Sequence, residues 1–478
     1  MDDRAGTTMS PPATGTSETA DPADVVARLR SFADTGRTQP LSWRLAQLDG
    51  LSRLLAEHGH ELEAALAADL GKAPTEAHLT EIGVLTQEIA HTRANLRRWL
   101  EPQTVSVPWQ YQPARASLVL EPLGVMLVMA PWNYPVLLLL APLVGALAAG
   151  NAVLLKPSEL APRTAETIAR LVPRFVEGVA VVTGGPARSS AVLAERFDHI
   201  VFTGSARVGR IVMTAAARHL TPVTLELGGK SPAWVDSTTD LPAAARRIAW
   251  AKLVNAGQTC VAPDYLLAPP DVAEQLAPLI SQEMVRMYGT DAAQSPDFGR
   301  IITTEHAERL QRLVSDSVAA GARTVLGGPA DPANRFVPPT ILADVTPDSP
   351  AMAEEIFGPV LPIVPVAGID DAIGLIRSRE KPLALYAFTD DSEVRTRLLR
   401  ETSSGALGFD VPLLQAAIPT LPFGGVGGSG MGAYHGDASV RAFSHAKPVV
   451  RKPLLPDTLA AIRPPFSALR QAVARRLL

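Results

Sequence analysis

The chain has 478 residues but a single cysteine, Cys260, so it cannot form an internal disulfide or a cysteine-based metal or iron–sulfur site. Histidine is scarce too. Of the nine, only His58 and His60 stand close together, in a polar helical stretch without a further ligand nearby, so no metal site is predicted. Basic residues are not in excess, because 44 lysines and arginines against 48 aspartates and glutamates leave a net charge of −4. That balance argues against nucleic-acid binding.

The sequence also lacks a continuous run that would span a membrane. Residues 122–155 contain no charged residue and no histidine, but Pro131, Pro135 and Pro142 interrupt them. A spanning helix needs about 20 continuous apolar residues, so a buried strand–turn–helix–strand unit explains this stretch better. Residues 1–22 have no apolar core, and we interpret them as a disordered leader rather than a signal peptide. We therefore expect a soluble, cytoplasmic protein.

Apolar residues make up 47% of the chain and charged residues 19%, which is enough for a large buried core. At about 150 residues per domain, the length suggests two to four domains. Residues 24–100 show helical spacing of apolar residues, and 105–120 are predicted to be extended. Strands then alternate with helices, which predicts an α/β fold with a parallel sheet and ligands at the carboxyl ends of its strands. We expect strands at 123–131, 151–159, 179–185, 199–204, 224–229, 336–342 and 360–366, and helices at 136–150, 163–177, 188–196, 241–254, 271–287 and 303–320.

Cys260 lies in the segment NAGQTCVAP, just after the end of an expected helix. A lone cysteine is usually a small buried hydrophobic residue. Here the surrounding residues are small and polar, and the amides of an adjoining helix would favour a thiolate. A thiol nucleophile also needs a donor for the oxyanion and a base that activates water.

Two residues are candidates for those roles. Asn133, in Pro-Trp-Asn-Tyr-Pro, follows an apolar strand, and its amide would donate to a developing oxyanion; the alternative is an ordinary turn asparagine. Glu226 is flanked by leucines in a strand pattern, and partial burial would raise its pKa toward the range of a general base. The alternative for Glu226 is an exposed strand carboxylate or a salt bridge with Lys230.

The segment Phe-Thr-Gly-Ser-Ala-Arg-Val-Gly at 202–209 follows a strand and opens a helix, whose first amides form an anion site. It is not the Gly-x-Gly-x-x-Gly fingerprint, and an ordinary turn at a helix start would look the same. Lys156 and Glu159 end another apolar strand and suit ribose hydroxyls or a phosphate, although a solvated turn is the alternative.

In their order along the chain, these segments resemble the aldehyde dehydrogenase superfamily. The matching motifs are PWNYP (131–135), LLKPSE (154–159), FTGS (202–205), ELGGK (226–230), GQTC (257–260), EEIFGP (354–359) and PFGGVGGSGMG (422–432). Further segments, such as AAARHLTPVTLELGGKSP and MGAYHG, are similar to class 3, the branch that oxidises fatty and aromatic aldehydes.

The resemblance implies NAD(P)-dependent oxidation of a hydrophobic aldehyde to a carboxylic acid. It makes Cys260 the nucleophile that forms a thiohemiacetal and then a thioester, Asn133 the oxyanion donor, and Glu226 the base that activates water for hydrolysis. NAD and NADP both stay open as the cofactor. The residues implied to contact the cofactor are Trp132, Lys156, Ser158, Glu159, Gly204, Ser205, Val208, Gly209, Glu355 and Phe357.

The family also implies the domain organisation. We expect a Rossmann-type NAD(P)-binding domain over 23–226, with bridging strands near 103–122, and an α/β catalytic domain over 227–432. Residues 433–478 would form a small oligomerisation strand and tail, giving a homodimer. The tail, AIRPPFSALRQAVARRLL, is too short and too charged to span a membrane. It is interpreted either as a helix packed on the protein or its dimer partner, or as a peripheral amphipathic helix that associates weakly with a membrane.

One departure from the family pattern is the segment Gly408-Phe409-Asp410, where Asn-Asp is usual. The loop that follows, VPLLQAAIPT (411–420), is apolar and uncharged, which fits either the mouth of a hydrophobic substrate site or a buried connection. Two other functions are compatible with this fold. An enzyme that passes the thioester to CoA is disfavoured by Glu226, and a non-catalytic structural protein on the same fold is disfavoured by the intact Cys260, Glu226 and Asn133.

Overall fold

The computed structural model of this chain describes residues 21–477, which form two large β-sheets and a small one. The first large sheet has six strands in the order β15-β7-β6-β3-β4-β5, parallel except for the short edge strand β15. Its strands are β3 (Val125–Met129), β4 (Ala152–Lys156), β5 (Val179–Val181), β6 (His199–Thr203), β7 (Val223–Glu226) and β15 (Gly430–Met431).

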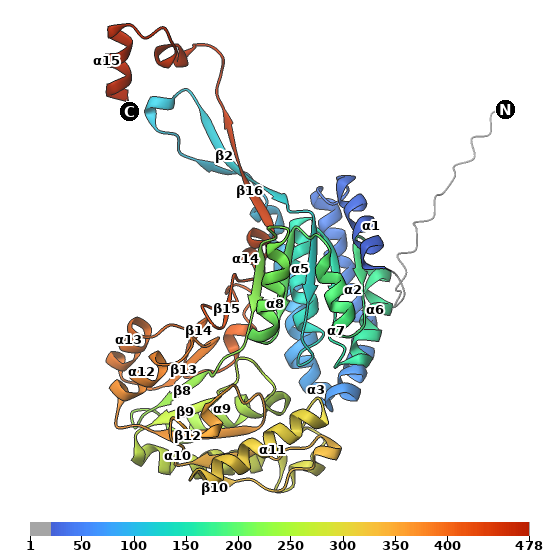
Figure 1. Cartoon of the computed structure of the whole chain (residues 1–478), viewed down its shortest axis with the longest axis vertical. Helices are drawn as coiled ribbons and strands as arrows, with labels where there is room; N and C mark the ends of the chain where they lie inside the picture. The colour runs from blue at the N-terminus through green and yellow to red at the C-terminus, as the bar shows by residue number, and fades with distance from the viewer. Residues whose placement is uncertain (1–20, 478) are drawn as a thin grey trace, which may run out of the picture.

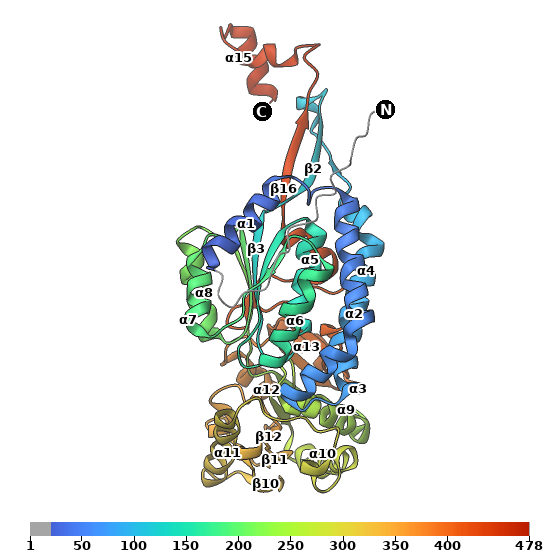
Figure 2. The same cartoon turned by 90° about the vertical axis from the view of Figure 1, so that its right-hand side faces the viewer.

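Helices cover both faces of this sheet because its strands are apolar on both faces. In β3, Val125, Leu127 and Met129 pack with α1, α7 and α8, whereas Met126 and Val128 pack on the opposite side with α2, α4, α5 and α6. Figure 2 shows the two helical layers on either side of β3. The helices are α1 (Pro22–Asp34), α2 (Leu41–Leu70), α3 (Pro74–Ala77), the π-helix η1 (His78–Ile82), α4 (Gly83–Trp99), α5 (Leu137–Ala149), α6 (Pro162–Phe175), α7 (Pro186–Ala194) and α8 (Ala206–Ala217).

The second large sheet has seven strands in the order β10-β11-β12-β9-β8-β13-β14, and its pairs are parallel except β10 with β11. It forms the lower body of the molecule in Figure 1. Its strands are β8 (Pro232–Val235), β9 (Tyr265–Ala268), β10 (Arg323–Leu326), β11 (Thr340–Ala343), β12 (Val360–Pro365), β13 (Ala384–Phe388) and β14 (Ala406–Phe409). The helices of this part are α9 (Leu241–Leu253), α10 (Pro270–Tyr288), α11 (Thr304–Ala319), α12 (Ile369–Arg377) and α13 (Ser392–Glu401).

A three-stranded antiparallel sheet forms an arm that projects from the body (Figure 1). It consists of β1 (Gln103–Val105), β2 (Arg115–Pro122) and β16 (Ser444–Arg451), with α14 (Gly436–Ala442) at its base. The terminal helix α15 (Ala468–Leu477) lies at the outer end of the arm, away from the helices around the two large sheets. Among residues 21–477, no helix combines the length and apolar character needed to cross a membrane.

Most expected elements of the first sheet are confirmed, with bounds that differ by a few residues. The second sheet was predicted less completely, because no strand was expected at β8, β9, β10, β13 or β14. Residues 1–20 of the leader expected over 1–22 lie outside the described residues. Pro22 already begins α1. The side chain of Asp21 caps this helix by accepting a hydrogen bond from Ala23 N at 3.1 Å. The expected domain boundaries stay predictions. Strand β15 lies in the segment expected to form the catalytic domain, but it pairs with β7 of the first sheet.

Candidate active site

The carboxyl ends of four neighbouring strands meet at one edge of the first sheet. Met129 at the end of β3 is in register with Lys156 of β4 and with Phe202 of β6, and Thr203 of β6 is in register with Glu226 of β7. The Trp132–Asn133 turn, Lys156, the loop at Gly204 and Glu226 therefore share this edge, where open α/β sheets bind their ligands.

The cysteine segment reaches this edge through a left-handed turn after α9. Asn255, Ala256 and Gly257 have φ angles of 55°, 52° and 75°. A Cβ on Gly257 would lie 2.2 Å from the carbonyl oxygen of Gly358, so the close approach of these two segments requires glycine. Gln258 is fully buried and fixes the turn, since its Nε2 donates to Arg300 O at 3.0 Å and its Oε1 accepts from Ile302 N at 2.9 Å.

Asn133 joins the two sheets. It is 2% exposed, and its Nδ2 donates to the carbonyl oxygen of Gln258, two residues before Cys260, at 3.0 Å. The next residue along each segment is also paired, because the Tyr134 hydroxyl lies 2.6 Å from Thr259 Oγ1. The amide nitrogen of Asn133 carries two hydrogens, and only one is used in the contact with Gln258.

Cys260 is a free, partly exposed thiol on the edge of the core. Loss of solvation raises its pKa to about 12, and the nearby carboxylates of Glu355 and Glu226 add to the effect. Hydrogen bonds from the backbone N–H groups of Cys260 and Val261 lower the pKa of the thiol, but they do not outweigh the loss of solvation. The isolated site therefore holds a protonated thiol at neutral pH, beside backbone N–H groups that already point at the sulfur.

Glu226 ends β7 and is 1% exposed. Neither carboxylate oxygen has a hydrogen-bond partner among the described residues. Burial raises the pKa of Glu226 well above its usual range, and the backbone of Gly425 offsets this only in part. The alternative of a salt bridge with Lys230 is wrong, because Lys230 pairs with Asp264 and donates to the carbonyl oxygens of Ala351 and Glu354 at 2.9 Å.

The segment 354–357 adds a second carboxylate and an aromatic ring to the site. A Cβ on Gly228 would lie 2.0 Å from the Glu355 carboxylate, which places Glu355 directly against the loop after Glu226. Burial and the neighbouring Asp264 raise the pKa of Glu355 to about 8. Phe357 contacts the ring of Trp132 edge to face, with centroids 5.4 Å apart.

The remaining predicted cofactor residues lie along the edge of the first sheet. Lys156 is 2% exposed, its Nζ donates to Pro157 O at 2.9 Å and lies 3.8 Å from Glu159, and burial lowers its pKa. Ser158 is partly exposed in the same turn and accepts from Leu160 N. Ser205 caps α8 by accepting from Val208 N at 3.4 Å, while Gly209 packs against Leu227.

The sequence profile of the aldehyde dehydrogenase family matches residues 4–449. The chain belongs to the aldehyde dehydrogenase family. It is 46% identical over 447 residues to a protein of Rattus norvegicus named "Aldehyde dehydrogenase, dimeric NADP-preferring", covering 93% of this chain and 98% of the relative. It is also 46% identical to "Aldehyde dehydrogenase family 3 member B1" of Homo sapiens, over 94% of this chain and 95% of the relative.

A solved structure of Staphylococcus aureus AldH in a substrate-bound state is similar throughout. Its TM-score is 0.91 at 39% identity, and the match covers 95% of this chain and 98% of that one. The predictions of family, of α/β fold class and of an NAD(P)-dependent enzyme that oxidises aldehydes to acids are thereby confirmed.

Several residues around the site of this aldehyde dehydrogenase were not singled out from the sequence. Asn255 donates through Nδ2 to Asn133 O at 2.8 Å. The rings of His306 and Trp132 pack edge to face, with centroids 5.5 Å apart. Lys72 and Glu81, from the helical N-terminal part, form a buried ion pair under the Asn133 turn. Sequence spacing holds no signal for these contacts, because they join segments far apart in the chain.

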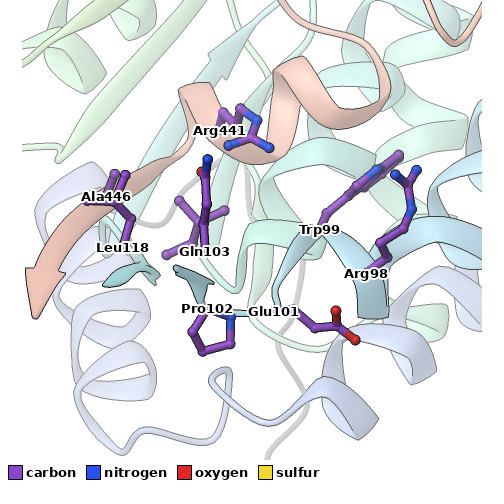
Figure 3. A pocket seen from close by; sticks show the side chains of 9 residues that line it. Arg98, Trp99, Glu101, Pro102, Gln103, Leu118, Arg441 and Ala446 are labelled. Atoms are coloured by element: carbon purple, nitrogen blue, oxygen red, sulfur yellow. The ribbon is translucent and has the colours of Figure 1, made fainter. Parts of the chain in front are cut away.

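The hollow at the base of the arm is separate from these residues. It is bordered by the end of α4, by β1 and β2, and by Arg441 of α14 (Figure 3). An adjoining hollow shares Arg98, Trp99 and Arg441 with it. Neither contains a residue that the sequence assigned to catalysis or to the cofactor.

Proposed function

We propose that this chain oxidises hydrophobic aldehydes by covalent catalysis at Cys260, with Asn133 as oxyanion donor and Glu226 as general base. One observation carries the proposal: the Asn133 amide reaches the backbone two residues before Cys260, at the sheet edge where Glu226 keeps a buried carboxylate without a partner. Thiol, amide donor and base are the three groups that acyl transfer through a cysteine needs.

In the first step the Cys260 sulfur attacks the aldehyde carbon. The carbonyl oxygen becomes an oxyanion, which accepts from the free N–H of the Asn133 amide and from the Cys260 backbone N–H. Because burial raises the pKa of the thiol to about 12, its proton has to leave as the carbon–sulfur bond forms. Water that reaches the partly exposed thiol takes this proton, so the step does not require Glu226.

In the last step Glu226 accepts a proton from water as the water oxygen attacks the thioester carbon. The carboxylic acid leaves and Cys260 is restored as a thiol. A raised pKa suits this role, because it makes the Glu226 carboxylate a stronger base toward the proton of water.

The residues at the sheet edge fit a dinucleotide. The first N–H groups of α8 have no partner within the helix and attract a phosphate, with Ser205 beside them. Lys156 and Glu159 suit the adenosine ribose, and Glu355, Phe357 and Trp132 the nicotinamide end; Gly228 leaves the space into which the Glu355 carboxylate extends. When bound there, NAD or NADP accepts the hydride that the substrate loses. The role of the protein is to hold the ring, the thiol and the base at one edge.

Three further parts of the proposal concern substrate, assembly and location. The uncharged loop 411–420 is mostly partly exposed, with Leu414 49% exposed, which favours an apolar aldehyde. A homodimer through the arm is supported by its exposed apolar residues, such as Val450 at 69% and Leu454 at 90%, and by the relative whose name says it is dimeric. A cytoplasmic location fits a free thiol that has to stay reduced.

The test combines a substrate panel with a change at the thiol. We expect NAD(P)H formation with aldehydes from hexanal to hexadecanal, benzaldehyde or cinnamaldehyde, without added CoA. Cys260→Ala should abolish this activity and keep cofactor binding. Because the chain has one cysteine, iodoacetamide should inactivate the enzyme at one label per chain. Substantial activity after complete labelling, or product formation that requires CoA, would overturn the proposal.

A further inference from the structure

Lys72 and Glu81 form an ion pair that no solvent reaches. Lys72 lies between α2 and α3, and Glu81 lies in the π-helix η1; both side chains are 0% exposed. Lys72 Nζ donates to Glu81 Oε1 at 2.6 Å. Two charges buried so completely are kept only where hydrogen bonds satisfy their remaining donors and acceptors.

Those remaining bonds go to the backbone of the Asn133 turn. Lys72 Nζ lies 3.4 Å from Asn133 O and 4.2 Å above the centre of the Tyr134 ring. The second oxygen of Glu81 accepts from Val136 N at 2.9 Å and from Leu137 N at 3.1 Å. The pair therefore holds the chain on both sides of Tyr134.

Helix α5 needs this contact because its own sequence cannot supply a cap. It begins in the apolar run VLLLL, and no side chain of its N-cap residue accepts a hydrogen bond. The first N–H groups of a helix are left without partners inside it, and burying them unpaired is costly. Glu81, from η1, supplies the missing acceptor, and the positive charge of Lys72 compensates the negative charge of Glu81.

The carbonyl of Asn133 has a second donor, Asn255, whose Nδ2 lies 2.8 Å away and also 3.2 Å from Gln258 O. The Asn133 amide donates to that same Gln258 carbonyl. The backbone and the side chain of Asn133 are thus both fixed relative to the segment that carries Cys260.

We propose that the Lys72–Glu81 pair is a positioning device that sets the place of the Asn133 amide for the oxyanion. This inference rests on the role proposed for Asn133. An apolar pair of similar size could fill the space, but it could not bind a carbonyl and two backbone N–H groups in fixed directions. Without the pair, the start of α5 is free to shift and the amide donor shifts with it.

The test is a double-mutant cycle on the rate of the first NAD(P)H burst, which reports the steps before hydrolysis. Lys72→Met removes the charge and leaves an unbranched side chain that is shorter by the terminal ammonium group. We expect it to slow the burst about 10- to 100-fold, since a misplacement near 1 Å costs up to about 10²-fold, with a smaller change in the aldehyde KM. In an Asn133→Ala background, Lys72→Met should change the burst less than about 3-fold, because the donor it positions is gone.

Arg44→Met provides the matched control. Arg44 is also a buried cation, 4% exposed, but its Nη1 donates to Ala148 O at the opposite end of α5. Its loss should lower the Tm and leave the burst rate unchanged. If Lys72→Met does not accumulate as folded protein, Glu81→Gln replaces it in the same double-mutant cycle. This change keeps one acceptor for the N-terminus of α5 and removes the charge of Glu81.

Each outcome decides one question. The positioning role is overturned if Lys72→Met slows the burst equally with and without the Asn133 amide. It is also overturned if Lys72→Met does not slow the burst although Asn133→Ala does. Both results leave the proposed function intact. An Asn133→Ala variant with the wild-type burst overturns the oxyanion assignment itself.

Discussion

Replacing Glu226 with glutamine should separate the two halves of the reaction. Gln keeps the shape of the side chain but cannot accept a proton from water. The change disturbs few contacts, because neither carboxylate oxygen makes a hydrogen bond of normal geometry among the described residues, and only the backbone of Gly425 acts on the carboxylate. The backbone bonds around it are unaffected, including the one from Gly204 N to Glu226 O at 2.9 Å. We therefore expect a folded variant in which only the base is lost.

The size of the effect follows from what the base does. General-base assistance is worth about 10²–10⁴-fold, so the steady-state rate should fall by a factor in that range, or about 3–5 kcal/mol of barrier. Hydride loss from the substrate does not need this base, so the burst should approach one NAD(P)H per active site. In the wild type, the rate of hydrolysis should rise with pH through the raised pKa of Glu226, since only the deprotonated carboxylate accepts a proton. That dependence should disappear in the variant.

Rapid mixing with a good aldehyde measures both phases in one experiment. Glu274→Gln, an exposed carboxylate on α10, serves as the control and should match the wild type. Loss of the burst would mean that Glu226 also takes the thiol proton. A variant with the wild-type steady-state rate and pH profile would show that Glu226 is not the base, and the proposed mechanism would then be wrong.

Two other predictions concern the cofactor side of the site. Lys156→Met should raise the KM for NADP several-fold more than the KM for NAD, because a buried cation beside the ribose-facing Glu159 favours a 2′-phosphate. Equal effects on the two KM values would contradict this prediction, and so would a wild-type enzyme that does not turn over with NADP. Glu355→Gln should speed alkylation of Cys260 by iodoacetamide at pH 8 in the absence of cofactor, because the Glu355 charge raises the pKa of the thiol. Glu354→Gln, the exposed neighbour, is the control, and equal rates in both variants would refute the coupling.

The first sheet could be predicted from sequence because its strands are apolar runs bounded by turn residues, such as VMLVMA between Gly124 and Pro131. Strands β8 and β13 have the sequences PAWV and ALYAF, and short apolar runs fit a strand or a buried helix equally well by periodicity alone. The motifs likewise predict which residues carry chemistry. They do not predict that Lys230 turns away from Glu226 to pair with Asp264, since both partners are within reach of a flexible side chain until the fold fixes it.

The residues that hold the site in place cannot be predicted from the sequence, for a general physical reason. A buried backbone group has to be paired, but the chain does not have to provide the partner locally. The carbonyl of Asn133 is bound by Lys72, 61 positions before it, and by Asn255, 122 positions after it. Neither residue lies at a spacing that helix or strand periodicity would connect with Asn133. A motif therefore shows where an amide, a thiol or a carboxylate is needed, and only the packing of α2, η1, α5 and the α9 turn shows what keeps them in place.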